Sequence, residues 1–293
     1  MSRYAFVNGS YKWMPKATVH VEDRGYQFAD GVYEVCLVVD GALWDSEGHL
    51  KRWQRSLDAL EIAPPIASRA ILPIAGALMR KNRLRDALIY MQATRGAAPR
   101  NHVFPSEGAI PSFVMTARRF SFEVSDSLAK EGVRAVTQPD IRWTRADIKS
   151  ISLLPNVLAK DEARRAGGVE AILVRNDVVT EGASSNIWIV DKSGNLRTHP
   201  RTNIILGGIT RENTLACAES LQISVIEEPF SPTEMLSARE VFMTAATNLV
   251  MPITHIDGKP IGAGKVGPIA KRLRSSYLDA AKRSAVPLLK QLQ

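Results

Sequence analysis

The sequence predicts a mixed α+β protein built of two lobes, and three observations support this fold class. The chain has 293 residues, about twice the length of a typical domain of ~150 residues. Strand patterns and helix patterns occur together in each half of the chain rather than in separate blocks. Hydrophobic residues make up 45% and charged residues 23%, which excludes a disordered chain, a collagen-like repeat and a small disulfide-rich scaffold.

In the first half, turn signals and residue spacing define the elements. Asn8-Gly9 is a strong hairpin signal between two short strand-like runs, and Asp40-Gly41 ends an apolar strand. The expected elements are a hairpin over 4–13, strands over 32–39, 42–44, 86–94 and 111–116, and helices over 49–60 and 72–81. We therefore expect residues 1–118 to form the smaller, N-terminal α/β domain.

A polar stretch over residues 119–127 predicts an interdomain linker, and residues 128–293 are expected to form the larger C-terminal α/β domain. Pro155 suits the first turn of a helix, and Gly167 suits its end. A last amphipathic helix is expected from about Pro268. The strands expected in this domain are 132–137, 170–174, 178–181, 185–190, 223–226 and 240–244.

The formal net charge of +8 raises the alternative of a nucleic-acid or anionic-surface binder. The basic residues lack interleaved aromatic residues and match no nucleic-acid-binding module, so we expect neither a nucleic acid nor a membrane as partner. No apolar run approaches the ~18 residues that a membrane-spanning helix needs, and the start lacks an apolar signal segment. Cys36 and Cys217 lie in apolar patterns and are expected to be buried, reduced thiols of a cytoplasmic protein.

Several motifs of other enzyme classes are incomplete. Residues 262–267 match G-x-G-x-x-G, but too little chain follows for a dinucleotide-binding unit, so a loop is expected there. Neither the histidines nor the cysteines have the spacing of metal ligands, so no metal site is expected. A serine hydrolase is not supported either, because no G-x-S-x-G sequence occurs.

Six segments, in order and with fitting spacing, carry the most specific pattern of the chain. They are residues 23–35 (DRGYQFADGVYEV), 49–52 (HLKR), 94–102 (TRGAAPRNH), 147–150 (DIKS), 176–186 (NDVVTEGASSN) and 206–211 (LGGITR). Over about residues 4–280 they resemble the fold-type IV pyridoxal-phosphate enzymes, among which the D-amino acid aminotransferases are most similar. The resemblance implies a two-lobed protein that holds pyridoxal 5′-phosphate between its lobes, and a homodimer.

The resemblance assigns the two central chemical roles. Lys149, which we expect to be carried by the C-terminal domain, matches the family's catalytic lysine, whose amine forms a Schiff base with the cofactor and then moves a proton between Cα and C4′. Glu181 matches the carboxylate that keeps the pyridine nitrogen protonated, so that the ring accepts electrons.

The resemblance also implies a set of cofactor-binding residues. Arg52 would bind the phosphate, and Thr210 is expected to cap a helix whose free N–H groups face that phosphate. Leu206 would pack on one face of the ring. Ala246 stands where the family often has threonine, which removes one hydrogen bond of about 0.5–1.5 kcal/mol. The expected cofactor-binding residues are Arg52, Glu181, Ser184, Ser185, Leu206, Ile209, Thr210, Ala246 and Thr247.

Substrate recognition is expected in the segment that contains Arg100 and His102. These residues are two apart, so in an extended segment they point the same way, and a guanidinium beside an imidazole can bind an α-carboxylate. The resemblance implies that this loop serves the partner subunit and that Tyr33 completes the carboxylate-binding set.

The expected reaction is a ping-pong transfer of the amino group between a D-amino acid, such as D-alanine or D-glutamate, and a 2-oxo acid. Three alternatives of the same fold stay open. They are an (R)-amine transaminase, a branched-chain L-amino acid transaminase and an aminodeoxychorismate lyase.

Overall fold

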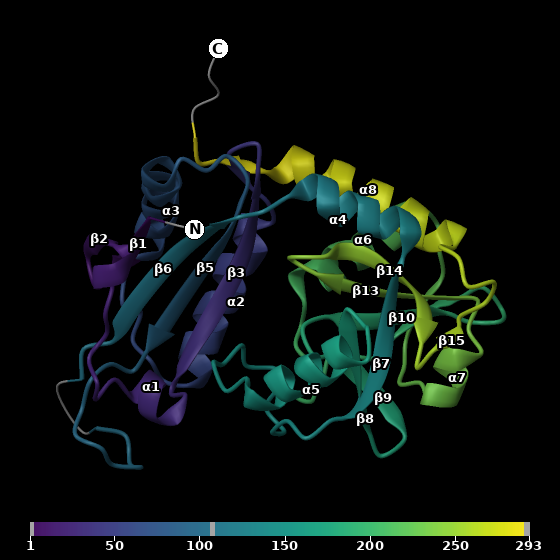
Figure 1. Ribbon diagram of the computed structural model, residues 1–293, viewed down its shortest axis with the longest axis horizontal. Coiled ribbons are helices and arrows are strands. Elements are labelled where there is room, and N and C mark those ends of the chain that lie inside the picture. The colour runs from purple at the N-terminus through teal and green to yellow at the C-terminus, as the bar shows by residue number, and fades with distance from the viewer. Residues whose placement is uncertain (1–2, 106–108, 290–293) are drawn as a thin grey trace. The chain divides into compact units, whose positions relative to one another are not determined.

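The computed structural model describes residues 3–105 and 109–289, which divide into two compact units (Figure 1). The first unit comprises the described residues up to Phe122, the short segment Ile148–Ser152 and the described residues from Ser284 to Leu289. The second unit comprises Glu123–Asp147 and Leu153–Arg283. Each unit combines one sheet with several helices, so the predicted α+β class is confirmed.

A seven-stranded sheet forms the first unit, with strand order β16-β4-β3-β5-β6-β1-β2. All of its paired neighbours run antiparallel. Its strands are β1 (Tyr4–Val7), β2 (Ser10–Trp13), β3 (Gly31–Val39), β4 (Ala42–Leu43), β5 (Ala87–Thr94), β6 (Ser112–Arg119) and β16 (Val286–Pro287). Its helices are the 3₁₀ turn Met14–Lys16, α1 (Arg24–Phe28), α2 (Ser46–Ala59) and α3 (Ser68–Asn82).

The core of the first unit lies on one face of this sheet. Val32, Cys36 and Val38 of β3 share one buried cluster with Trp53 of α2 and Met79 of α3. Because successive side chains of a strand point to opposite faces, the even-numbered residues of β3 face α2, and the odd-numbered ones face away from it. This alternation decides which residues of β3 meet which groups of the site.

The second unit is built on a mixed sheet with strand order β12-β11-β10-β13-β14-β7-β8-β9, and β15 pairs with β14. Its strands are β7 (Val133–Pro139), β8 (Glu170–Arg175), β9 (Val178–Gly182), β10 (Asn186–Val190), β11 (Leu196–Thr198), β12 (Val225–Glu227), β13 (Glu240–Ala245), β14 (Leu249–Ile256) and β15 (Lys259–Pro260). Its helices are α5 (Leu154–Arg165), α6 (Ile209–Ser220) and α7 (Pro232–Leu236), with most of α4 (Phe122–Glu131) and α8 (Pro268–Ser284).

The sheet of the second unit is covered on both faces, which explains the continuous apolar run of β10. Ile187 and Ile189 face one buried cluster, which also contains Met235 of α7. Trp188 points to the other face, where its ring stacks on Phe242 at 5.7 Å between centroids. A strand that is buried on both faces shows no apolar–polar alternation, as observed here.

Most predicted elements are confirmed, including the N-terminal hairpin and the helix that begins at Pro268. Residues 119–127 differ from the expected irregular linker, because they include the first half of α4. The apolar face of α4 buries Ala129, and such a short amphipathic helix is hard to distinguish from a polar loop. Strand β14 has no predicted counterpart, since Pro252 and the polar residues Thr254 and His255 interrupt its apolar pattern.

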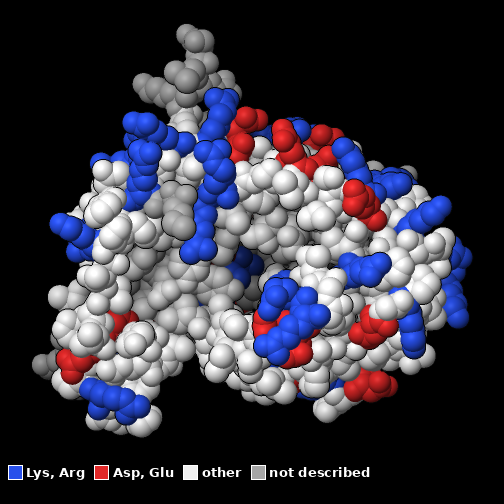
Figure 2. Space-filling view, in the orientation of Figure 1, with Lys and Arg blue, Asp and Glu red and all other residues white. Residues whose placement is uncertain are grey.

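Cys36 and Cys217 are both buried and free, as predicted. Within the described residues, no helix is long and apolar enough to cross a membrane. On the face shown in Figure 2, Lys and Arg are spread over both units with Asp and Glu among them.

Candidate active site

Lys149 belongs to the first unit and not to the C-terminal domain in which its position in the sequence placed it, because its segment lies along the edge of β3. Its carbonyl accepts a hydrogen bond from the Tyr33 N–H at 3.0 Å, and its own N–H donates to Ser56 Oγ of α2 at 3.3 Å. Ser150 forms an antiparallel bridge with Val32. The backbone of Lys149 is thus fixed by a strand on one side and a helix on the other, which limits where its amine can reach.

The side chain of Lys149 lies over an aromatic ring. Its Nζ is 4.2 Å from the centroid of the Tyr33 ring, which in turn stacks on Tyr90 at 5.8 Å. Burial, followed by the nearby Tyr33, raises the pKa of Tyr90 to about 12, so this phenol stays protonated at neutral pH. The Tyr90 hydroxyl donates to Gln92 Oε1 at 2.6 Å. The structure therefore brings the predicted residues Lys149 and Tyr33 together and adds Tyr90.

The opposite face of β3 carries a buried ion cluster that contains the predicted phosphate ligand. Glu34 is fully buried, and Arg52 donates to its two carboxylate oxygens at 2.9 and 2.6 Å. His49 Nδ1 lies 3.1 Å from the same carboxylate. His49 and Arg52 are one helical turn apart on α2, so both side chains face the strand. Glu34 fixes the direction of the Arg52 guanidinium.

Electrostatics keep this cluster charged. Burial opposes ionisation of Glu34, but Arg52 and then His49 outweigh it and hold the pKa of Glu34 far below its usual range. Burial also disfavours the charged form of His49, but Cys36 and Glu34 together raise its pKa to about 10.

This cluster predicts a pH dependence of stability. A histidine whose folded pKa is raised stabilises the protein fully below its unfolded pKa of about 6.5, and that stabilisation is lost as the pH rises towards about 10. The pKa of Glu34 is lowered, so its contribution persists throughout this range. His49→Gln keeps a donor but no charge. The melting temperature of the variant should therefore lie furthest below that of the wild type near pH 6.

The measurement is thermal unfolding of both proteins between pH 6 and 10. We expect the difference in melting temperature to shrink steadily as the pH rises. A difference that stays constant over this range would mean that His49 is neutral in the folded protein.

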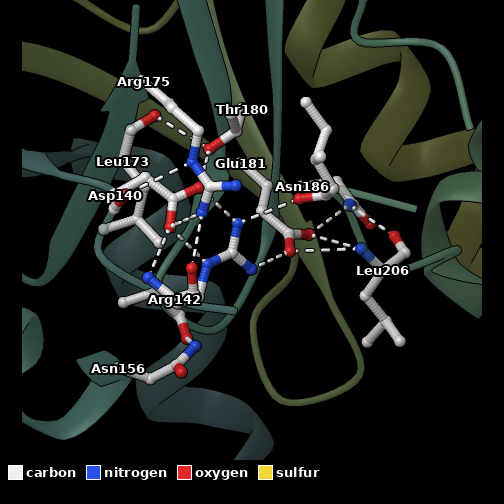
Figure 3. Close-up of polar contacts among 11 residues, drawn as sticks. Asp140, Arg142, Asn156, Leu173, Arg175, Thr180, Glu181, Asn186 and Leu206 are labelled. Carbon is white, nitrogen blue, oxygen red and sulfur yellow. Dashed lines mark hydrogen bonds and ion pairs between the residues drawn. The ribbon is translucent and has the colours of Figure 1, made fainter. Parts of the chain in front are cut away.

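In the second unit, Glu181 stands near the end of β9, as predicted, and is held by three neighbouring residues (Figure 3). Leu206 N donates to both of its carboxylate oxygens at 3.1 Å, and Asn186 Nδ2 donates to Oε2 at 3.0 Å. Arg142 forms an ion pair with Oε1. The same Asn186 amide donates to the Leu206 carbonyl at 2.8 Å, which fixes Leu206 beside Glu181.

Arg142 is itself fixed by a buried aspartate. Asp140 binds Arg142 through both carboxylate oxygens and accepts a hydrogen bond from Thr180 at 2.8 Å. Burial opposes the charge of Arg142, but Asp140 and then Glu181 outweigh it and raise the pKa of Arg142 above its usual value. Arg142 is therefore a permanent cation beside Glu181, and it favours the ionised form of that carboxyl group.

The start of α6 differs from the prediction. Gly208, not Thr210, is the N-cap, so the expectation that Thr210 caps the helix is wrong. Residue 208 is glycine because a Cβ there would lie 2.1 Å from Asn186 Oδ1. The helix starts before Thr210, at Ile209.

This shift leaves the Thr210 hydroxyl available. Its Oγ1 is buried and has no hydrogen-bond partner among the described residues. A buried hydroxyl without a partner, next to the free N–H groups of a helix start, is suited to bind a phosphate. On this observation, Ile209 and Thr210 fit the phosphate of pyridoxal 5′-phosphate.

Ser184 and Ser185 lie in the turn after β9, and their hydroxyls are already engaged. Both donate to Glu170 Oε2 at 2.8 Å, and Lys160 Nζ donates to Oε1 of this fully buried carboxylate at 3.0 Å. Any contact of these serines with a cofactor would therefore use their remaining lone pairs or backbone groups. Ala246 and Thr247 lie in the turn between β13 and β14 and are half-buried.

The loop after β5 carries Arg100 and His102, both exposed in the first unit. The Arg100 guanidinium carbon is 4.8 Å from the centroid of the Phe28 ring, and the His102 ring is 5.3 Å from it. Both residues thus face one ring, in agreement with their expected common direction.

The structure describes the predicted residues as two sets, one in each unit. The first contains Tyr33, Arg52, Arg100, His102 and Lys149, and the second contains Glu181, Ser184, Ser185, Leu206, Ile209, Thr210, Ala246 and Thr247. Prediction from sequence missed Glu34, Ser56, Tyr90, Arg142 and Asn186. Glu34 could have been recognised from the sequence, because it alternates with Val32 and Cys36 on the core-facing side of a mainly apolar strand, where a charged residue is unusual. No described group of three or more His, Cys, Asp or Glu residues is arranged to hold a metal ion.

Comparison with known proteins identifies related chains. The family model described as amino-transferase class IV matches residues 31–256. The chain is 42% identical to D-alanine aminotransferase of Staphylococcus epidermidis over 272 residues, which cover 93% of this chain and 95% of the relative. It is 39% identical to D-alanine aminotransferase of Bacillus licheniformis over 273 residues, with the same coverage of both chains.

Solved structures show the same fold. The branched-chain amino acid aminotransferase of T.th. with pyridoxamine 5′-phosphate has a TM-score of 0.89 and 25% identity, covering 99% of both chains. The branched-chain amino acid aminotransferase of Escherichia coli has a TM-score of 0.86 and 25% identity, covering 96% of this chain and 95% of the other.

Proposed function

The chain belongs to the amino-transferase class IV family, and from this premise we propose that it transfers amino groups between D-amino acids and 2-oxo acids. The protein is a pyridoxal-phosphate-dependent aminotransferase. The observation that carries the D-amino acid preference is the 39–42% identity, over 93% of the chain, to relatives named D-alanine aminotransferase. The exposed pair Arg100 and His102 supports a substrate with an α-carboxylate rather than a simple amine, because both side chains can bind that group.

Several side chains would hold the cofactor. We assign the phosphate to Arg52, Ile209 and Thr210, the pyridine nitrogen to Glu181, and one face of the ring to Leu206. When bound, pyridoxal phosphate supplies an aldehyde that captures amino groups and a ring that accepts electrons from Cα. The unpartnered hydroxyl of Thr210 supports its assignment, and the cation beside Glu181 supports that of the carboxylate.

The residues of this chain then perform the proton chemistry. Lys149 Nζ would take up the proton that the substrate loses from Cα and would return a proton to Cα of the second substrate in the other half-reaction. Tyr33 keeps an aromatic surface within 4.2 Å of that amine. Glu181 keeps the proton on the pyridine nitrogen, and Arg100 with His102 holds the substrate carboxylate. We also propose a homodimer and a cytoplasmic location, the latter supported by two buried free thiols.

The experiment is a panel of half-reactions with purified, cofactor-loaded protein. D-Alanine and D-glutamate should bleach the visible absorption of the bound cofactor, and pyruvate or 2-oxoglutarate should restore it. L-Leucine and (R)-1-phenylethylamine serve as comparisons, because fold similarity to branched-chain enzymes makes a branched-chain L-amino acid transaminase the second candidate. Bleaching by L-leucine but not by D-alanine would reject the D-amino acid assignment in favour of that candidate.

A further inference from the structure

Residues 23–30, which we call the α1 platform, have no role in the function proposed so far, although they begin the first of the six motif segments. In the structure they pack against the end of β5 and the loop of residues 95–104 that follows it, most of which belongs to another of these segments (94–102). Asp23 forms a bridge with Ala97, and Thr94 Oγ1 donates to Asp23 Oδ2 at 3.0 Å. Two motifs that lie far apart in the sequence therefore meet in the first unit, since Asp23 and Thr94 are 71 residues apart.

Arg24 is the residue of the α1 platform that binds the backbone of the loop through hydrogen bonds. It is 2% exposed, and its Nε donates to Asp30 Oδ2 at 2.8 Å. Its Nη1 donates to the Asn101 carbonyl at 2.6 Å and reaches the Val103 carbonyl at 3.5 Å. These two carbonyls flank His102, so one buried guanidinium fixes the backbone on both sides of that residue.

Asp30 links Arg24 to Arg95, which contacts both ends of the loop. Besides Arg24, it binds Arg95 Nε at 2.8 Å and Nη2 at 3.1 Å. Arg95 also donates to the carbonyls of Leu60 and Glu61 at the end of α2, and the Phe104 ring lies 3.7 Å from its guanidinium carbon. The loop is thereby attached to the core of the unit through one carboxylate and two buried arginines.

Phe28, at the end of α1, sets the side chains that project from the loop. Its ring centroid is 4.8 Å from the Arg100 guanidinium carbon and 5.3 Å from the His102 ring. Neither Arg100 nor His102 makes a hydrogen bond or an ion pair within the described residues, so their donors are free to bind an anion. A guanidinium on an aromatic face keeps its N–H groups at the edge available for such a ligand.

We propose that the α1 platform positions Arg100 and His102, and that Arg24 and Phe28 thereby set the affinity of the enzyme for substrates with an α-carboxylate. This inference rests on the proposed function, in which Arg100 and His102 bind that carboxylate. Both half-reactions use a substrate with an α-carboxylate, so the platform acts on the amino acid and the 2-oxo acid alike. Arg24 and Phe28 are positioning residues, since they act through the loop.

The test uses two substitutions in the cofactor-loaded enzyme. Arg24→Lys keeps the charge opposite Asp30, but a lysine ammonium lacks the planar fork that reaches Asp30 and the loop carbonyls at once. Phe28→Leu keeps an apolar side chain but removes the ring face. We expect the KM for D-alanine and for pyruvate to rise about tenfold, the effect of weakening one charge-assisted hydrogen bond to a carboxylate.

Two further measurements separate this role from general damage to the fold. The kcat should change by less than about threefold, and the dissociation constant of pyridoxal phosphate should not change. Amide hydrogen exchange of residues 97–104 should become faster in both variants. Tyr26→Leu is the matched control, because the Tyr26 side chain is 79% exposed and makes no hydrogen bond or ring contact with the loop among the described residues, unlike those of Arg24 and Phe28. It should leave the KM, kcat and exchange of the loop as in the wild type.

Distinct results contradict the two proposals. Unchanged KM values in the active variants would overturn the role of the α1 platform, even if loop exchange became faster. A parallel deterioration of KM, kcat and cofactor affinity would also overturn it, since that pattern marks a structural role. A wild-type holoenzyme that converts no D-amino acid would instead overturn the proposed function. Phe28→Leu keeps the test valid if Arg24→Lys fails to fold.

Discussion

Replacing Lys149 by alanine is expected to abolish transamination while leaving the fold intact. The kcat should fall by at least about 10⁴-fold, the scale on which removal of a covalent nucleophile acts. The physical reason is that, in the proposed function, one amine has to both engage the aldehyde of the cofactor and carry the Cα proton. Truncation spares the local structure, because the segment is held through backbone groups, by Tyr33 N and Ser56 Oγ, and not through the Lys149 side chain.

Two measurements test this expectation. Steady-state rates give the loss of activity, and borohydride treatment of the wild type should attach the cofactor permanently to the peptide that contains Lys149. Lys192→Ala, at an exposed turn of the second unit, is the matched control and should keep full activity and the same labelled peptide. If Lys149→Ala retained a tenth of the wild-type rate, or if another lysine were labelled, the assignment of Lys149 would be wrong.

Replacing Glu181 by glutamine should have the second-largest effect, with kcat lower by about 10²–10³-fold, as for the loss of one preorganised electrostatic group. Glutamine has the shape of glutamate but no charge, so it no longer favours the proton on the pyridine nitrogen. The fold should persist, because Asp140 still pairs with Arg142 and the side-chain carbonyl still accepts from Leu206 N.

Two measurements check this role, the kcat and the absorption spectrum of the bound cofactor. The spectrum reports the protonation of the pyridine ring, which should change in Glu181→Gln and not in the control. Glu162→Gln provides the control, since Glu162 is 55% exposed in an ion pair on the surface of α5. That variant should keep the wild-type kcat and spectrum. A Glu181→Gln enzyme within about threefold of the wild type would show that the ring does not depend on this carboxylate.

The fold was predictable where local patterns carry it. The Asn8-Gly9 hairpin, the strand that begins at Val32 and the amphipathic face of α2 appear as expected, because turn chemistry and periodicity are properties of neighbouring residues. The start of α6 was not predictable in this way. Thr210 is a good capping residue by type, but the N-cap is Gly208, where close contact with Asn186 leaves no room for a side chain.

The networks that hold the site residues could not be predicted in the same way. Arg142 meets Glu181 across 39 residues, and Arg24 meets Asn101 across 77. Ser184 and Ser185 look like free hydroxyls in the sequence, yet both donate to Glu170, which lies on a different strand. No short window of sequence contains such a pair, so its partners follow only from the pairing of strands and the packing of helices.

The fold class, the family and the residue types available for chemistry could thus be inferred from the amino-acid order alone, because each of these depends on order and spacing along the chain. How those residues are held depends on the folded structure. In the fold, Arg52 binds Glu34, and Arg142 forms an ion pair with Glu181. The Thr210 hydroxyl has no hydrogen-bond partner among the described residues, and the α1 platform contacts Arg100 and His102 through the Phe28 ring. The reason is that buried charges must find partners, and burial itself is a product of long-range packing.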